Sequence, residues 1–155
     1  MTDKERKLVS DFLYQPNDIE NIIACKLATI ERLEASQGLK SPSLNADHVQ
    51  TSHSLDQMGD TLAKVADLQN EVNRLQNLLS RKVIEVSNAI SRLEDTREQK
   101  VLTMYYIQRD KHGKRLKLSD IEAELHYSRR SVLYFKSQAI EHLFEILQSL
   151  HSFAP

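Results

Sequence analysis

The chain has 155 residues, of which 40% are hydrophobic, 28% are charged and 6% are aromatic, and it contains no tryptophan. This length holds one domain of ordinary size or two small ones. There are three glycines and three prolines, fewer turn-forming residues than an all-β fold needs. The composition therefore predicts an all-α protein and argues against a sandwich or a barrel.

Cysteine content and hydropathy exclude further classes. The single cysteine, Cys25, excludes an intramolecular disulfide and a zinc site with several cysteine ligands. No apolar run approaches the roughly 18 residues of a membrane span, and the N-terminal residues lack the apolar core of a secretion signal. We therefore expect a cytoplasmic protein without a membrane partner.

The net charge of −1 hides an uneven distribution along the chain. Residues 1–95 carry 11 Lys or Arg against 15 Asp or Glu, whereas residues 96–155 carry 10 against 7. A basic excess confined to one part of a chain favours an anionic partner at that part.

The first periodic segment follows Pro16, and Asn17 has the residue type and position of a helix N-cap. Apolar residues then recur at steps of three and four, which predicts a helix over residues 17–36. The stretch from about 37 to 54 is polar, rich in serine and without a period, so we expect a flexible linker there.

The clearest pattern is an apolar repeat of seven residues in a helix that begins near Ser54. A repeat held over nearly forty residues, about 60 Å of helix, is typical of a coiled-coil seam. The helix of residues 17–36 can fold back to cover part of this seam, and a second copy of the chain can cover the rest. We expect both arrangements together; the alternative is a monomeric hairpin. The seam residues are Met58, Leu62, Val65, Val72, Leu79, Val83, Val86, Ile90 and Leu93.

A further helix begins at Asp95, because Asp95 and Glu98 have the spacing of a capping box. It extends to about Arg109. A basic loop, from Asp110 to Lys117, follows it.

Two short helices separated by a corner are predicted between Leu118 and Leu143. Ser119 is the expected cap of the first helix, with Glu122 completing its capping box. The corner contains His126, and Ser128 is the expected cap of the second helix. A short helix, a three-residue corner and a second helix make a helix-turn-helix motif.

The start of the second helix suits duplex DNA. A major groove admits a helix, and an arginine there can make a bidentate contact with guanine. A helix N-terminus and a neighbouring basic loop favour contacts with phosphate groups. Such contacts fix the position of the protein on the duplex but do not read the base sequence. The expected base contacts are Arg129, Arg130, Leu133 and Tyr134. The expected phosphate contacts are Lys114, Arg115, Lys117, Ser128, Ser131, Lys136 and Ser137.

From Asp95 onward the chain resembles the fourth region of sigma-70-type factors, and over residues 17–147 it resembles the ArpU family of phage transcriptional regulators, similar in style to RinA-type late-gene activators. The matching residues are Arg97, Val101, Leu102, Tyr105, Tyr106, Ile107, the helix from Ile121 to Leu125, Ser128-Arg129-Arg130, and Ala139 to Leu143. A charged loop stands where that family often has a tryptophan. The resemblance implies a helical N-terminal half, transcription control at phage late promoters, and RNA polymerase as a further partner.

The sequence is therefore compatible with two functions. The first is a homodimeric, sequence-specific DNA-binding regulator, a phage or prophage late-gene activator associated with the host nucleoid. Its residues 1–95 form a coiled-coil region for oligomerisation, and residues 96–155 form the DNA-binding domain. The alternative is an adaptor or anti-activator that binds RNA polymerase or a host regulator through its helices, without binding DNA.

Enzymatic activity has no positive support in the sequence. The chain lacks a glycine-rich phosphate loop, a nucleophile elbow and other catalytic signatures. Its histidines lack the partners of a metal site, so we expect no metal, no cofactor and no small-molecule substrate. The histidines are His48, His53, His112, His126, His142 and His151.

Overall fold

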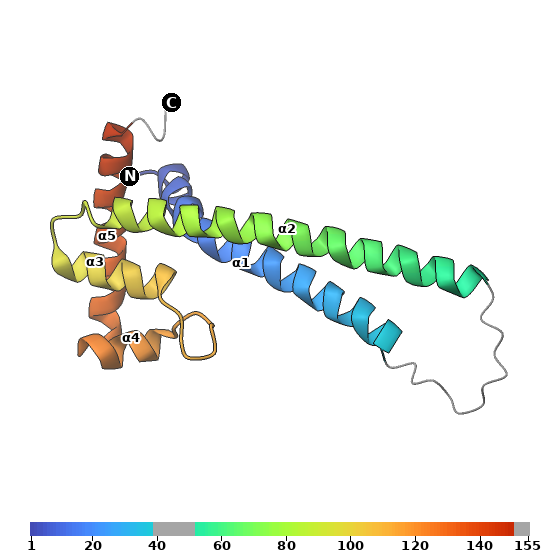
Figure 1. Cartoon of the computed structure of the whole chain (residues 1–155). Coiled ribbons are helices and arrows are strands. Elements are labelled where there is room, and N and C mark those ends of the chain that lie inside the picture. The colour runs from blue at the N-terminus through green and yellow to red at the C-terminus, as the bar shows by residue number, and fades with distance from the viewer. Residues whose placement is uncertain (39–51, 151–155) are drawn as a thin grey trace. The chain divides into compact units, whose positions relative to one another are not determined.

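The computed structural model of the protein describes residues 1–38 and 52–150. Most of the linker expected at about 37–54 lies outside these residues. The described residues contain no strand, so the prediction of an all-α fold is confirmed. In chain order the elements are α1 (Asp3–Gly38), α2 (Ser52–Ile90), α3 (Thr96–Leu102), the π-helix η1 (Thr103–Ile107), α4 (Leu118–Leu125) and α5 (Arg129–Ser149) (Figure 1).

None of these described helices combines the length and the apolar character that crossing a membrane requires.

Helix α1 begins earlier than expected. The prediction that it starts at Asn17 is wrong, because Pro16 lies buried inside the helix. The actual start carries its own capping box: the Thr2 amide donates to a Glu5 carboxylate oxygen at 2.7 Å, and the Glu5 amide donates to the Thr2 hydroxyl at 3.3 Å.

A proline inside a helix removes one backbone donor and usually favours a helix start or a kink. Here the residues before Pro16 are held by tertiary burial, since Val9 and Leu13 are fully buried and Phe12 is nearly so. Packing of these side chains thus outweighs the local signal on which the sequence prediction rested.

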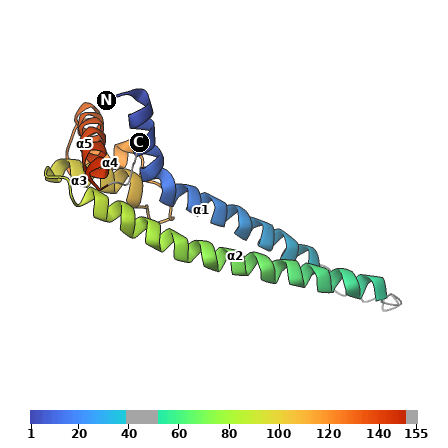
Figure 2. The ribbon, with the colours of Figure 1, turned by 90° about the horizontal axis from the view of Figure 1, so that it is seen from above.

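The chain forms two compact units, and α1 and α2 contribute to both. One unit contains residues 1–18 and 80–155, and the other contains residues 19–79. We call them the motif unit and the hairpin unit. In the hairpin unit, α1 and α2 run side by side (Figures 1 and 2), and the Lys26 ammonium lies 2.5 Å from the Glu71 carboxylate. The apolar core of the hairpin unit consists of Ile19, Ile23, Ile30, Val65, Leu68 and Val72.

The seven-residue repeat on α2 therefore serves two cores. Val65 and Val72 pack in the hairpin unit, whereas Val86 and Ile90 at the end of α2, and Leu93 just after it, are buried in the motif unit. Leu79 and Val83, between these groups, are half-buried. At the other end of the repeat, Met58 and Leu62 remain 44% and 60% exposed.

The motif unit is larger than the segment 96–155, which the sequence predicts as the DNA-binding domain. Its main core joins the start of α1, the end of α2, α3, η1 and α5, and a second cluster holds α4 against α3, η1 and α5. The predicted domain boundary at residue 95 therefore differs from the boundaries of the two compact units, because residues on both sides of it share one core. The main core consists of Val9, Phe12, Leu13, Val86, Ala89, Ile90, Leu93, Leu102, Tyr106, Ala139, Ile140, Leu143 and Leu147. The second cluster consists of Val101, Met104, Ile121 and Val132.

Candidate nucleic-acid interface

Helices α4 and α5 meet at a tight turn. His126 ends α4 in the left-handed conformation, with φ of 57°, and its amide donates to the Glu122 carbonyl. The Tyr127 amide donates to the same carbonyl at 3.2 Å. Ser128 caps α5, since its hydroxyl accepts a hydrogen bond from the Ser131 amide at 3.2 Å. The predicted corner and the predicted Ser128 cap are both confirmed.

The predicted cap of α4 is wrong. The helix begins at Leu118, so Lys117 rather than Ser119 is the N-cap residue. The Asp120 carboxylate accepts the Lys117 amide at 3.0 Å, which satisfies a backbone donor at the helix start. Glu122 is left to face the Arg129 guanidinium of α5, at 3.8 Å.

Four side chains form an exposed patch on the first two turns of α5. We call Arg129, Arg130, Leu133 and Tyr134 the recognition face. All four are exposed, Leu133 at 44% and Tyr134 at 60%, whereas Val132 between them is fully buried. Residues three and four apart are neighbours on a helix surface, so the four side chains are contiguous. The structure thus brings together all the predicted base contacts.

The basic loop before α4 is an ordered turn. The Asp110 carboxylate accepts the amides of His112 and Lys114 at 2.8 and 2.9 Å. Gly113 at its tip has a φ of 74°, a conformation that glycine adopts without strain. Lys114 and Lys117, two of the predicted phosphate contacts, are exposed on this segment.

Two other predicted phosphate contacts, Arg115 and Lys136, meet on tyrosine rings and are half-buried. The Arg115 guanidinium lies 4.9 Å from the ring centre of Tyr14 and 5.0 Å from that of Tyr105, and the Lys136 ammonium lies 3.9 Å from the Tyr105 centre. Burial lowers the pKa of Lys136. The nearby Tyr14 raises this pKa, whereas the positive charge of Arg115 lowers it. Neither cation has an ion pair with a carboxylate in the described part of the chain.

The serines predicted to contact phosphate have partners within the chain. The Ser131 hydroxyl lies 3.0 Å from the Ser128 hydroxyl. Ser137 accepts a hydrogen bond from the Arg6 guanidinium of α1 at 3.4 Å, and Arg6 also pairs with Glu141 at 3.1 Å. No local pattern in the sequence predicts this contact, because Arg6 lies before the helix that the pattern predicts over residues 17–36.

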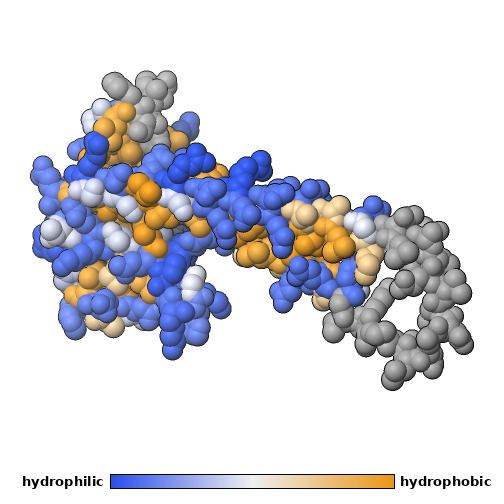
Figure 3. All heavy atoms as spheres, in the orientation of Figure 1, coloured by the Kyte–Doolittle hydropathy of each residue, from blue (hydrophilic) through white to orange (hydrophobic). Residues whose placement is uncertain are grey.

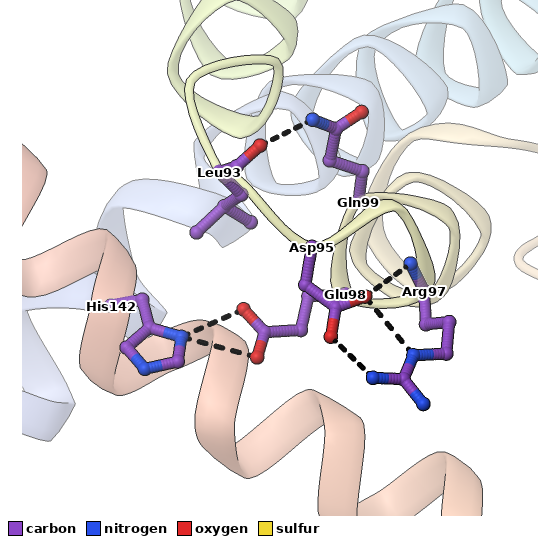
Figure 4. Close-up of polar contacts among 6 residues, drawn as sticks. All are labelled: Leu93, Asp95, Arg97, Glu98, Gln99 and His142. Carbon is purple, nitrogen blue, oxygen red and sulfur yellow. Dashed lines mark hydrogen bonds and ion pairs between the residues drawn. The ribbon is translucent and has the colours of Figure 1, made fainter.

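A second long-range pair, shown in Figure 4, joins α3 to α5. Asp95 caps α3 as predicted and accepts the Arg97 amide at 2.8 Å. Glu98, however, does not complete a capping box: its carboxylate is buried and lies 2.8 Å from the Nδ1 atom of His142. This hydrogen bond raises the pKa of His142.

Within the residues that the structure covers, no group of three or more His, Cys, Asp or Glu side chains is arranged to hold a metal ion.

The described residues thus form an all-α fold in which a helix-turn-helix motif follows two long helices along the chain. The chain belongs to the DUF1492 family, which is described as a protein of unknown function and whose profile matches residues 38–144. The match starts at the last residue of α1 and extends through most of α5. No curated protein and no solved structure matches the chain.

Proposed function

We propose that this protein is a sequence-specific regulator of transcription that binds double-stranded DNA through the recognition face. The observation that carries the proposal is the exposure of Arg129, Arg130, Leu133 and Tyr134 together at the start of a capped helix. A helix of this kind fits a major groove, where an arginine binds guanine O6 and N7 and apolar groups contact thymine methyls.

Cations around the recognition face support the same proposal. Lys114 and Lys117 are exposed on the ordered loop before α4, and Arg115 and Lys136 lie together without a carboxylate partner among the described residues. Positive charges at these positions would bind phosphate groups and hold the helix in register without reading sequence.

The resemblance to the ArpU family extends the proposal to late promoters of a phage or prophage, with RNA polymerase as a further partner. Apolar surface on the hairpin unit supports a homodimer. Figure 3 shows apolar side chains gathered along α1 and α2, and Met58 and Leu62 are among the exposed apolar residues. Two copies of the motif would read two half-sites of one operator.

Selection of duplexes from a genomic pool, followed by affinity measurements on the selected site, tests this function. Arg129→Ala and Arg130→Ala should each lose about 1–3 kcal/mol of discrimination at one base pair. Lys82→Ala, in an exposed ion pair with Glu85 on α2, is the matched control and should keep full selectivity. A double arginine variant as selective as the parent would contradict this role of the recognition face.

A second candidate is an adaptor that binds RNA polymerase or a host regulator. It is favoured by the net charge of −1 and by the exposed apolar side chains of Leu133 and Tyr134, which also suit a protein partner. Capture of purified polymerase, with no mobility shift of any duplex at low salt, would support the adaptor and exclude the DNA-binding regulator.

A further inference from the structure

We propose that Arg6, on the first turns of α1, is a DNA phosphate contact at the far edge of the recognition face. This inference rests on the proposed DNA-binding function. It adds to the interface a residue that is 123 positions before Arg129 in the chain and lies outside the family match at residues 38–144.

The position of Arg6 on α5 carries the inference. Ser137, which accepts from Arg6 at 3.4 Å, follows Leu133 by four residues and Tyr134 by three. It therefore lies one helical turn, about 5.4 Å, beyond the recognition face and on the same side of the helix. A duplex lying along the recognition face would bring its backbone toward the guanidinium group of Arg6.

Arg6 has donors available for a phosphate. The guanidinium group carries five N–H donors, and its contacts with Ser137 and Glu141 use one donor from each of two nitrogens. The side chain is 46% exposed and that of Glu141 is 39% exposed. Exposed ion pairs contribute little to stability, so a phosphate can share or replace the Glu141 carboxylate at small cost.

The backbone around Arg6 is fixed within the motif unit. Residues 1–18 belong to the same compact unit as α5, and Val9, Phe12 and Leu13 are buried in its main core. The helix start is closed by the reciprocal hydrogen bonds of Thr2 and Glu5. The cation is therefore held beside α5 before DNA binds, which reduces the entropy lost on binding.

Charge reversal along α5 explains why a cation is needed at this point. The recognition face carries Arg129 and Arg130, whereas Glu141 and Glu145 follow on the next turns. Without Arg6, the carboxylate of Glu141 would repel the phosphate backbone. Arg6 can act in two ways, as a direct phosphate ligand or as a mask for Glu141, and a double variant separates them.

The test compares Arg6→Ala, Glu141→Gln and Arg6→Ala/Glu141→Gln for binding to the selected duplex and to a random duplex. A lost phosphate contact weakens both complexes by a similar factor and reduces the slope of log affinity against log salt by about 0.9. With this smaller slope, the fall in affinity between about 50 and 200 mM salt should be about 3.5-fold smaller than that of the parent. We expect the double variant to bind both duplexes more weakly than Glu141→Gln alone, by a similar factor, and with a slope smaller by about 0.9.

The control is Lys82→Ala, which breaks an exposed ion pair with Glu85 on α2 and should leave the slope unchanged. Thermal unfolding of each variant shows that the fold is kept. Equal affinity and equal slope for the double variant and Glu141→Gln would overturn the phosphate contact and leave only the masking of Glu141. If the parent binds no duplex at all, the proposed DNA-binding function itself fails. That result differs from equal affinity of the two variants, which would overturn only the phosphate contact of Arg6.

Discussion

The Glu98 carboxylate and the Nδ1 atom of His142 lie 2.8 Å apart, although 44 residues separate them in the chain. The side chain of Glu98 is 6% exposed and that of His142 is 52% exposed, so a buried acceptor is satisfied by a base that remains in contact with water (Figure 4). The pair fixes α3 against the middle of α5, the helix that carries the recognition face.

The first prediction is that this pair stabilises the protein in a pH-dependent way. Because the folded state raises the pKa of His142 above its ordinary 6.5, the stabilisation is full below that value and is lost as the pH rises through the raised pKa. Replacing His142 with Gln should therefore lower the free energy of unfolding at about pH 6 more than at about pH 9. The difference should be about 1 kcal/mol or less, since the imidazole is half exposed.

Urea denaturation of the parent and His142→Gln at both pH values measures this difference. His112→Gln, at an exposed position in the basic loop, is the control and should show no such trend. A cost of His142→Gln that grows with pH would contradict the assignment.

The second prediction concerns the first turns of α1. Leu13 is fully buried in the core that also contains residues of α5, so Leu13→Ala should lower the free energy of unfolding by about 2–5 kcal/mol. Leu8→Ala is the matched control: Leu8 is 47% exposed, and its change should stay within about 0.5 kcal/mol. Equal stability of the two variants would show that the start of α1 does not belong to the motif unit.

The third prediction concerns the turn of the motif. His126 adopts a left-handed conformation that favours glycine and disfavours branched side chains. His126→Gly should raise the free energy of unfolding by up to about 1 kcal/mol, and His126→Val should lower it by about 1–2 kcal/mol. Thermal melts would measure both, and a valine variant as stable as the parent would be inconsistent with this turn.

The fourth prediction separates folding from DNA binding at Lys136. Burial lowers the pKa of Lys136, so holding its charged form in the folded state carries a cost that methionine avoids. Lys136→Met should change the free energy of unfolding by about 1 kcal/mol or less, because the loss of the contact with the Tyr105 ring offsets that gain. It should nevertheless weaken DNA binding.

Affinity for the selected duplex at several salt concentrations measures this loss. The slope against log salt should fall by about 0.9, and Lys136→Arg should keep it. A Lys136→Met variant with unchanged affinity and slope would exclude Lys136 from the interface.

The fifth prediction concerns oligomerisation through the hairpin unit. Leu62 belongs to the seven-residue repeat and is 60% exposed, so a second copy of the chain would cover it in a dimer. Leu62→Glu should shift the mass in sedimentation from dimer to monomer without loss of helix content. Ala63→Glu, at the exposed neighbour outside the repeat, is the control; a parent that sediments as a monomer would contradict the dimer.

Local signals in the sequence predicted much of the motif correctly. The Ser128 and Asp95 caps and the corner at His126 each depend on residue types within a few positions of one another, and the long helix α2 is predicted by an apolar repeat along one helix. The exposure of Arg129 and Arg130 also agrees with the helical period, because the buried positions of α5 follow the apolar pattern.

The features that the sequence did not predict depend on contacts between distant segments. Pro16 and Asn17 carry a strong local start signal, but the burial of Leu13 extends α1 past it. Glu98 has the spacing of a capping box, but His142 takes its carboxylate. The seven-residue repeat does not show that its two ends enter different cores, since periodicity reports which side of a helix is apolar and not what covers it.

DNA binding by the recognition face is best tested by the salt dependence of binding to a duplex selected from a genomic pool. If basic residues around the recognition face bind phosphates, affinity should fall linearly on a log–log scale, with a slope of about −0.9 for each phosphate neutralised. We expect a slope of several units for the parent and a shallower slope for Arg129→Ala/Arg130→Ala. Absence of binding at about 50 mM salt, or an affinity that does not respond to salt, would contradict this expectation.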